Sequence, residues 1–138
     1  MKKIVIVVIA SVLFYRCTDA NEQALEAENK NVTLRSDTIN VVRLTDTLEI
    51  HESNCRGCAY EVSTHFDISD SAGIIKLLEI VTTDNNPPDM DGGSISKDLV
   101  LVPQKTGFTN LKLYKFWSQQ VTAQDSARFS TYSIEVQN

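Results

Sequence analysis

Residues 95–116 read ISKDLVLVPQKTGFTNLKLYKF, and this stretch decides the fold class. Residues 95–102 and 109–116 are each rich in aliphatic and β-branched side chains, which is typical of β-strands. Within the second run, Leu111 and Leu113 are spaced to face one side of a strand. The residues between the runs, PQKTG at 103–107, have the composition of a turn. The stretch therefore predicts two strands joined by a turn.

The same alternation of short runs and turns continues in both directions along the chain. Polar segments at 53–57 and 69–73 have turn chemistry, and the segments at 84–93 and 117–125 read as longer loops. Seven or eight short strands with little helix predict an all-β protein, an antiparallel β-sandwich. The further runs predicted as strands are residues 38–43, 47–51, 58–66, 74–83 and 127–136.

The N-terminus has a different composition from the rest of the chain. Lys2 and Lys3 precede an apolar run at residues 4–13, which is the pattern of a bacterial export signal and is too short to span a bilayer. Cys17 follows this run, where a lipoprotein signal places the cysteine that becomes lipidated; a free cysteine is the alternative. We expect a signal peptide at 1–16, a lipoprotein tether at 17–36 and one β-sandwich domain at 37–138. The expected location is the cell envelope, lipid-anchored on its periplasmic or surface side, or secreted.

The charge balance excludes some classes of partner. Removal of residues 1–16 takes away three of the 13 Lys and Arg residues, so ten remain against 18 Asp and Glu, a net charge of −8. Binding to nucleic acid or to anionic lipid headgroups requires clustered basic residues, and none occur. We therefore expect no nucleic acid partner, and membrane contact only through a lipid anchor on Cys17.

The sequence contains none of the familiar catalytic motifs, so we expect a protein that is not an enzyme and has no cofactor. Cys55 and Cys58 lie two residues apart in an exported chain, which favours a disulfide between them. A thioredoxin-like redox pair is less favoured, because the residues after Cys58 read as a strand and not as a helix. A metal site would have to recruit His51 and His65 as well, and we expect no metal.

Two further loop features each allow a functional and a structural interpretation. Asp84, Asp89 and Asp91 share one loop, but their spacing does not match an EF-hand, so a solvated acidic loop is favoured over a calcium site. Trp117 is the only tryptophan and begins a polar loop, where it either anchors a partner or folds back onto the end of the sandwich.

The order of the loop motifs resembles the chagasin family of inhibitors of papain-type cysteine proteases. That family has an immunoglobulin-like sandwich with three inhibitory loops, whose motifs are Asn-Pro-Thr-Thr-Gly, Gly-x-Gly-Gly and Arg-Pro-Trp. In this chain the resemblance covers roughly residues 37–138. The corresponding residues are Asn54, Cys55, Arg56 and Gly57 in the first loop, Asp91, Gly92 and Gly93 in the second, and Lys115, Phe116 and Trp117 in the third.

The resemblance implies an immunoglobulin-like fold and a monomeric, reversible, competitive inhibitor whose partner is a papain-type cysteine protease. The ten residues just named would form the protease-binding surface, which requires that all three loops lie at one end of the sandwich. The alternative is a non-inhibitory binding or adhesion module of the cell envelope with the same fold.

Overall fold

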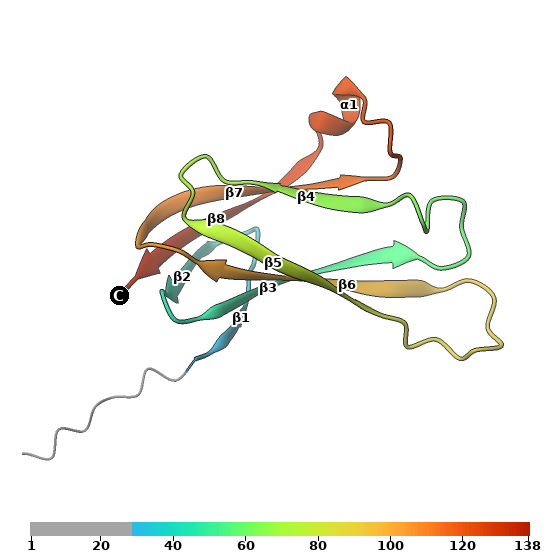
Figure 1. Cartoon of the computed structure of the whole chain (residues 1–138), viewed down its shortest axis with the longest axis horizontal. Helices are drawn as coiled ribbons and strands as arrows, with labels where there is room; N and C mark the ends of the chain where they lie inside the picture. The colour runs from blue at the N-terminus through green and yellow to red at the C-terminus, as the bar shows by residue number, and fades with distance from the viewer. Residues whose placement is uncertain (1–28) are drawn as a thin grey trace, which may run out of the picture.

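The computed structural model describes residues 29–138, so the predicted signal peptide and Cys17 lie outside the described residues. Two four-stranded sheets pack face to face as a sandwich (Figure 1). The first sheet has the order β1-β3-β6-β5, and the second has the order β2-β8-β7-β4. The strands are β1 (Asn31–Thr33), β2 (Ile39–Arg43), β3 (Thr47–Cys55), β4 (His65–Ser69), β5 (Ile75–Thr83), β6 (Ser94–Pro103), β7 (Gly107–Phe116) and β8 (Phe129–Gln137), and one short helix, α1 (Ala123–Ser126), precedes β8.

The predicted all-β sandwich is confirmed, and its main pairings are antiparallel. β6 lies between β3 and β5, and β7 lies between β8 and β4, with antiparallel pairing throughout. Only the edge strands β1 and β2 pair in parallel, with β3 and β8 respectively. β1 belongs to the segment that the sequence assigned to the tether, so the folded domain begins before residue 37.

The core follows from the period-2 pattern of the strands. Successive side chains of a strand point to opposite faces, so alternate residues of each sheet meet the other sheet. Six side chains are completely buried in this way, and they come from four strands. They are Leu48, Ile50, Leu99, Leu101, Leu111 and Ile134.

One predicted strand is wrong. Residues 58–66 were expected to be a strand, but β4 begins only at His65, and residues 56–64 form a loop. The predicted turn at 53–57 is also displaced, because β3 continues to Cys55, which pairs with Ser94 of β6. The backbone bonds inside the loop are local, from the amide of Glu61 to the carbonyl of Cys58 and from the amide of Thr64 to that of Tyr60. This stretch therefore has no ladder partner and turns back on itself.

The described residues contain no helix long and apolar enough to cross a membrane.

Candidate functional site

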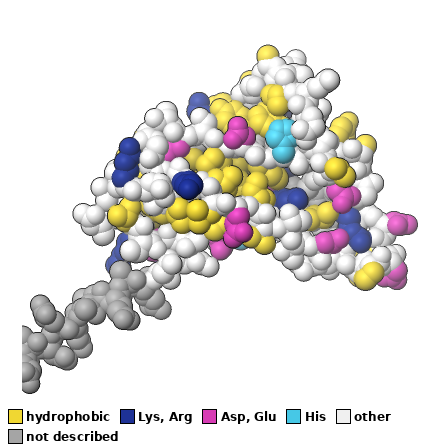
Figure 2. Space-filling model, in the orientation of Figure 1, with side chains coloured by type: hydrophobic (Ala, Val, Ile, Leu, Met, Phe, Trp, Pro, Cys, Tyr) yellow, Lys and Arg dark blue, Asp and Glu magenta, His cyan; other side chains and the backbone are white. Residues whose placement is uncertain are grey.

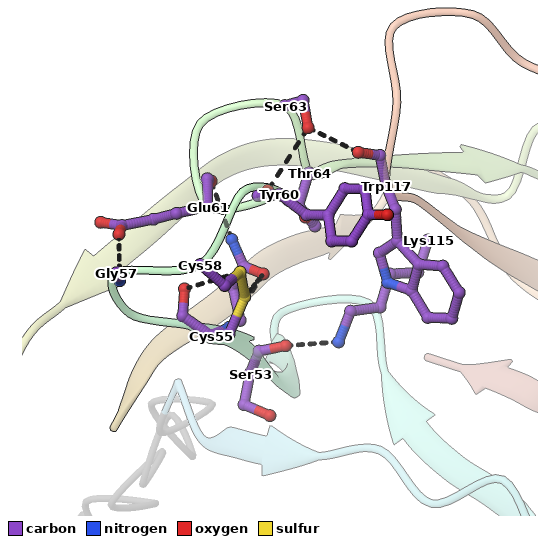
Figure 3. Close-up of a disulfide and its surroundings, with 11 residues drawn as sticks. Ser53, Cys55, Gly57, Cys58, Tyr60, Glu61, Ser63, Thr64, Lys115 and Trp117 are labelled. Carbon is purple, nitrogen blue, oxygen red and sulfur yellow. Dashed lines mark hydrogen bonds between the residues drawn. A yellow bond between two sulfur atoms is a disulfide. The ribbon is translucent and has the colours of Figure 1, made fainter. Parts of the chain in front are cut away.

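Three loops meet at one end of the sandwich. We call residues 56–64 the first loop, residues 84–93 the second loop and residues 117–128 the third loop. The amide of Arg56 donates to the carbonyl of Gly93 over 3.0 Å, which joins the first loop to the second. The hydroxyl of Ser63 donates to the carbonyl of Trp117, which joins the first loop to the third (Figure 3). The prediction that these loops share one end is confirmed.

The first loop is closed by a disulfide and by side-chain bonds. Cys55 and Cys58 are paired, with Cα atoms 5.9 Å apart (Figure 3). Asn54 is buried, and its Nδ2 donates to the carbonyl of Glu61 over 2.9 Å. The carboxylate of Glu61 in turn accepts the amide of Gly57, whose φ of +74° is a conformation that favours glycine. These bonds fix the loop in one shape before any partner binds.

Asp84 and Asn86 organise the second loop. Asp84 Oδ1 accepts both the amide and the side-chain Nδ2 of Asn86, over 3.0 and 2.7 Å. The same Nδ2 donates to the carbonyl of Ser94 over 2.7 Å. Gly93 has a φ of +99°, and a Cβ there would lie 2.5 Å from Asn86 Oδ1, so no other residue fits without moving the amide. The hydrogen bonds from Asn86, followed by the charge of Arg56, hold the pKa of Asp84 below its usual value.

Arg56 fastens the first loop to the second. Its Nε lies 2.8 Å from Asp84 Oδ2, and its Nη1 donates to the carbonyl of Met90. Only a fifth of its side-chain surface remains accessible. The sequence assigned Arg56 to protease contact, but its guanidinium is committed to the second loop.

Lys115 and Phe116 hold the base of the third loop. Lys115 of β7 donates to the carbonyl of Ser53 and lies 3.3 Å from the carboxylate of Glu52, which links the two sheets (Figure 3). Phe116 is only 8% exposed and packs between His65, with ring centroids 5.1 Å apart, and Tyr114, at 5.8 Å.

The predicted contact residues differ in exposure. Asn54 and Phe116 are buried, so their side chains shape the loops from beneath. Arg56 and Lys115 are partly exposed but are paired inside the domain. Gly57, Asp91, Gly93 and Trp117 are exposed, whereas Cys55 and Gly92 are partly exposed.

Trp117 is 52% exposed, so part of its side chain is covered by the domain and part is open to solvent. It lines a hollow of about 490 Å³ together with Cys55, Tyr60 and Gly93 (Figure 3). It also borders a second hollow of about 450 Å³ with Glu52 and Phe129. Trp117 thus contributes to the lining of two depressions at the loop end.

The sequence missed three exposed apolar residues at this end. Val62 is 95% exposed, and Tyr60 and Met90 are each about half exposed. Tyr60 and Val62 had been placed on the face of a strand, because their spacing imitates the alternation of one. Hydrophobic and acidic side chains both reach the surface at this end of the molecule (Figure 2).

The thioredoxin-like and metal interpretations gain no support from the described residues. Cys55 ends a strand and Cys58 lies in a turn, so no helix N-terminus is present to lower a thiol pKa. His51 pairs with Asp98 over 2.6 Å, and His65 packs on Phe116. Between residues 29 and 138, no group of three or more potential metal ligands occurs.

No family model matches this sequence, and no curated protein matches it in sequence. Among solved structures, the chain is similar to the cysteine protease inhibitor EhICP2 from Entamoeba histolytica, with a TM-score of 0.56 and 17% identity over 80% of this chain and 98% of that one. It is similar to the solution structure of amebosin, with a TM-score of 0.56 and 18% identity over 79% of this chain and 98% of that one. The resemblance to chagasin-like inhibitors is confirmed at the level of the fold, an immunoglobulin-like β-sandwich.

Proposed function

We propose that this protein is a reversible, competitive inhibitor of papain-type cysteine proteases that inserts its three loops into the protease cleft. One observation carries the proposal: the three loops gather at one end, joined by hydrogen bonds and an ion pair, and present Tyr60, Val62 and Trp117 to solvent. The fold shared with a cysteine protease inhibitor supports this role.

The physical basis is a preformed wedge. A loop that is already ordered loses little conformational entropy when it binds, so more of the contact energy appears as affinity. The disulfide, the Asn54 amide and the Arg56 guanidinium each remove freedom from the first loop. The exposed apolar side chains then supply the surface that loses water in the complex.

Titration into active papain with a fluorogenic peptide substrate tests the proposal. A competitive inhibitor raises the apparent KM and leaves kcat unchanged, because substrate and loops compete for the same cleft. Trypsin, whose nucleophile is a serine, is the matched control and should remain fully active. Unchanged papain kinetics, or equal inhibition of both enzymes, would refute the proposed function.

We further propose that the domain is lipid-anchored through Cys17 with its loops directed away from the membrane. β1 enters the first sheet where Asn31 pairs with Thr47, and β3 runs from Thr47 to the loop end at Cys55. The chain therefore enters the domain at the end opposite the three loops (Figure 1). Membrane fractionation of the wild type and Cys17→Ser tests the anchor: the variant should become soluble, and equal partitioning of the two would exclude it.

A further inference from the structure

The Cys55–Cys58 disulfide lies within the surface that the proposed function assigns to protease binding. Cys55 lines the 490 Å³ hollow between the loops, beside Tyr60, Gly93 and Trp117. Both cysteines are only partly buried. A group of the protease that enters this hollow therefore meets the sulfur-bearing side chain of Cys55, whereas Cys58 does not line it.

The first loop does not depend on the disulfide alone for its shape. Asn54 Nδ2 holds the carbonyl of Glu61, the Glu61 carboxylate holds the amide of Gly57, and the amide of Arg56 holds the carbonyl of Gly93. None of these three bonds involves a sulfur atom. The disulfide can therefore react while the loop stays folded.

The proposed partner supplies a suitable reactant. The nucleophile of a papain-type protease is a cysteine whose pKa is strongly lowered, so it is present as a thiolate at neutral pH. A thiolate attacks a disulfide sulfur through a mixed-disulfide intermediate, and no external oxidant is required.

Resting on the proposed function, we propose that the Cys55–Cys58 disulfide is a thiol-exchange site that captures the catalytic cysteine of the target protease as a mixed disulfide. The protease thiolate attacks Cys55 Sγ, and a new sulfur–sulfur bond forms between the two chains. The Cys55–Cys58 bond breaks, and Cys58 leaves as a thiolate that takes up a proton. The protease sulfur is oxidised and the Cys58 sulfur is reduced, so electrons balance within the complex.

The same geometry makes the capture reversible. Cys58 stays three residues from Cys55, and its Sγ lies 3.9 Å from the carbonyl oxygen of Cys55, an acceptor for the new thiol. Because the freed thiol remains tethered beside the mixed disulfide, it attacks that bond in return and releases the protease.

Papain that has been activated and then freed of reductant is the probe. It is mixed with the full chain, and free thiols are trapped with N-ethylmaleimide before mass spectrometry without reductant. In a preparation without a lipid on Cys17, the expected product has the summed mass of both chains plus two maleimides, one on Cys58 and one on Cys17, and a reducing agent dissociates it. A slow phase of inhibition should accompany its formation.

The matched variant is Cys55→Ser/Cys58→Ser, in which the other three loop bonds remain. It should lose both the slow phase and the adduct, and its fast, competitive phase should be weaker than that of the wild type because the first loop has lost one constraint. Papain with its catalytic cysteine replaced by serine should also form no adduct with the wild-type chain.

The outcomes separate this inference from the proposed function. Competitive inhibition without any adduct overturns the capture and leaves the inhibitor function standing. An adduct that persists with serine-substituted papain, or that forms as readily with free cysteine, overturns the capture because the disulfide is then merely reactive. Absence of both inhibition and adduct overturns both proposals.

Discussion

Substitution of Val62 by aspartate separates binding from folding at the loop end. Val62 is 95% exposed, and the turn that carries it is closed by the amide and hydroxyl of Thr64, which donate to the carbonyl of Tyr60 over 2.9 and 2.7 Å. Neither bond involves the valine side chain. Because surface substitutions away from such bonds change stability by no more than about 0.5 kcal/mol, Val62→Asp should unfold at nearly the same temperature as the wild type.

The expected loss of binding is much larger than the change in stability. Complete burial of a valine side chain contributes about 1.5 kcal/mol or more, and this contribution disappears in the variant. A carboxylate buried without a partner adds a desolvation cost of about 1.5 kcal/mol or more. The sum of about 3 kcal/mol corresponds to inhibition weakened by about 150-fold.

The inhibition constant against papain and the thermal unfolding midpoint are measured on the same preparations. Val41→Asp is the matched control, because Val41 is also exposed but lies on β2, and its neighbour across the sheet is Glu135 near the end of β8. That variant should inhibit as the wild type does. If Val62→Asp keeps full inhibition, or if Val41→Asp loses as much, then the tip of the first loop does not enter the protease.

Substitutions at three further positions test other parts of the structure. Trp117→Ala should weaken papain inhibition by about 30-fold. Because about half of the Trp117 surface is covered by the domain, the variant should also lower the unfolding free energy by about 2 kcal/mol. An unchanged inhibition constant would exclude the indole from the interface. Arg56→Ala should weaken inhibition by about tenfold and increase amide hydrogen exchange in the second loop, because Asp84 loses its cation. Arg56→Lys should restore little, because an ammonium group cannot make the same fork of bonds. An unaltered exchange rate would contradict this role of Arg56. Partial burial raises the pKa of Asp70, but hydrogen bonds from Thr109 and from three backbone amides outweigh it and leave the pKa below its usual value. The stabilisation that Asp70 provides is therefore complete above the ordinary pKa of an aspartate and is lost as pH falls through the folded pKa. Asp70→Ala should lower the unfolding free energy by about 2 kcal/mol at pH 7 and reduce the acid sensitivity of unfolding, without changing inhibition. An unchanged acid transition would refute this account.

The sequence was sufficient for the strands whose signal is local. Residues 74–83, 95–102 and 109–116 carry their β-branched and alternating side chains in the sequence itself, and β5, β6 and β7 follow them closely. The Pro-Pro and Gly-Gly pairs likewise marked the second loop. The first loop was mispredicted because the end of β3 is decided by its pairing with β6, a contact with residues about forty positions away that no local pattern records.

The roles of the site residues depended on similar long-range contacts. The sequence placed two cations in the loops, but it could not show that Arg56 meets Asp84 or that Lys115 meets Glu52. The burial of Phe116 was not predicted for another reason. Phe116 lies on the same face of β7 as Tyr114, and this face is directed away from the core. Neighbouring side chains nevertheless cover Phe116. Alternation gives the face of the sheet on which a residue lies, and not what covers that face.

The first loop reaches rigidity by a different route from the motif it resembles. Where that motif places a proline, this chain has Cys55, which is bridged to Cys58, and the following Arg56 is fixed to the second loop. Proline restricts one backbone torsion, whereas the disulfide closes the loop on itself and the guanidinium ties it to a neighbour. The cost of this solution is that the Arg56 and Lys115 charges are used inside the domain. Under the proposed function, we expect recognition at this end to depend chiefly on the shape and apolar surface of Tyr60, Val62 and Trp117, so these side chains, and not the cations, are the positions to substitute first.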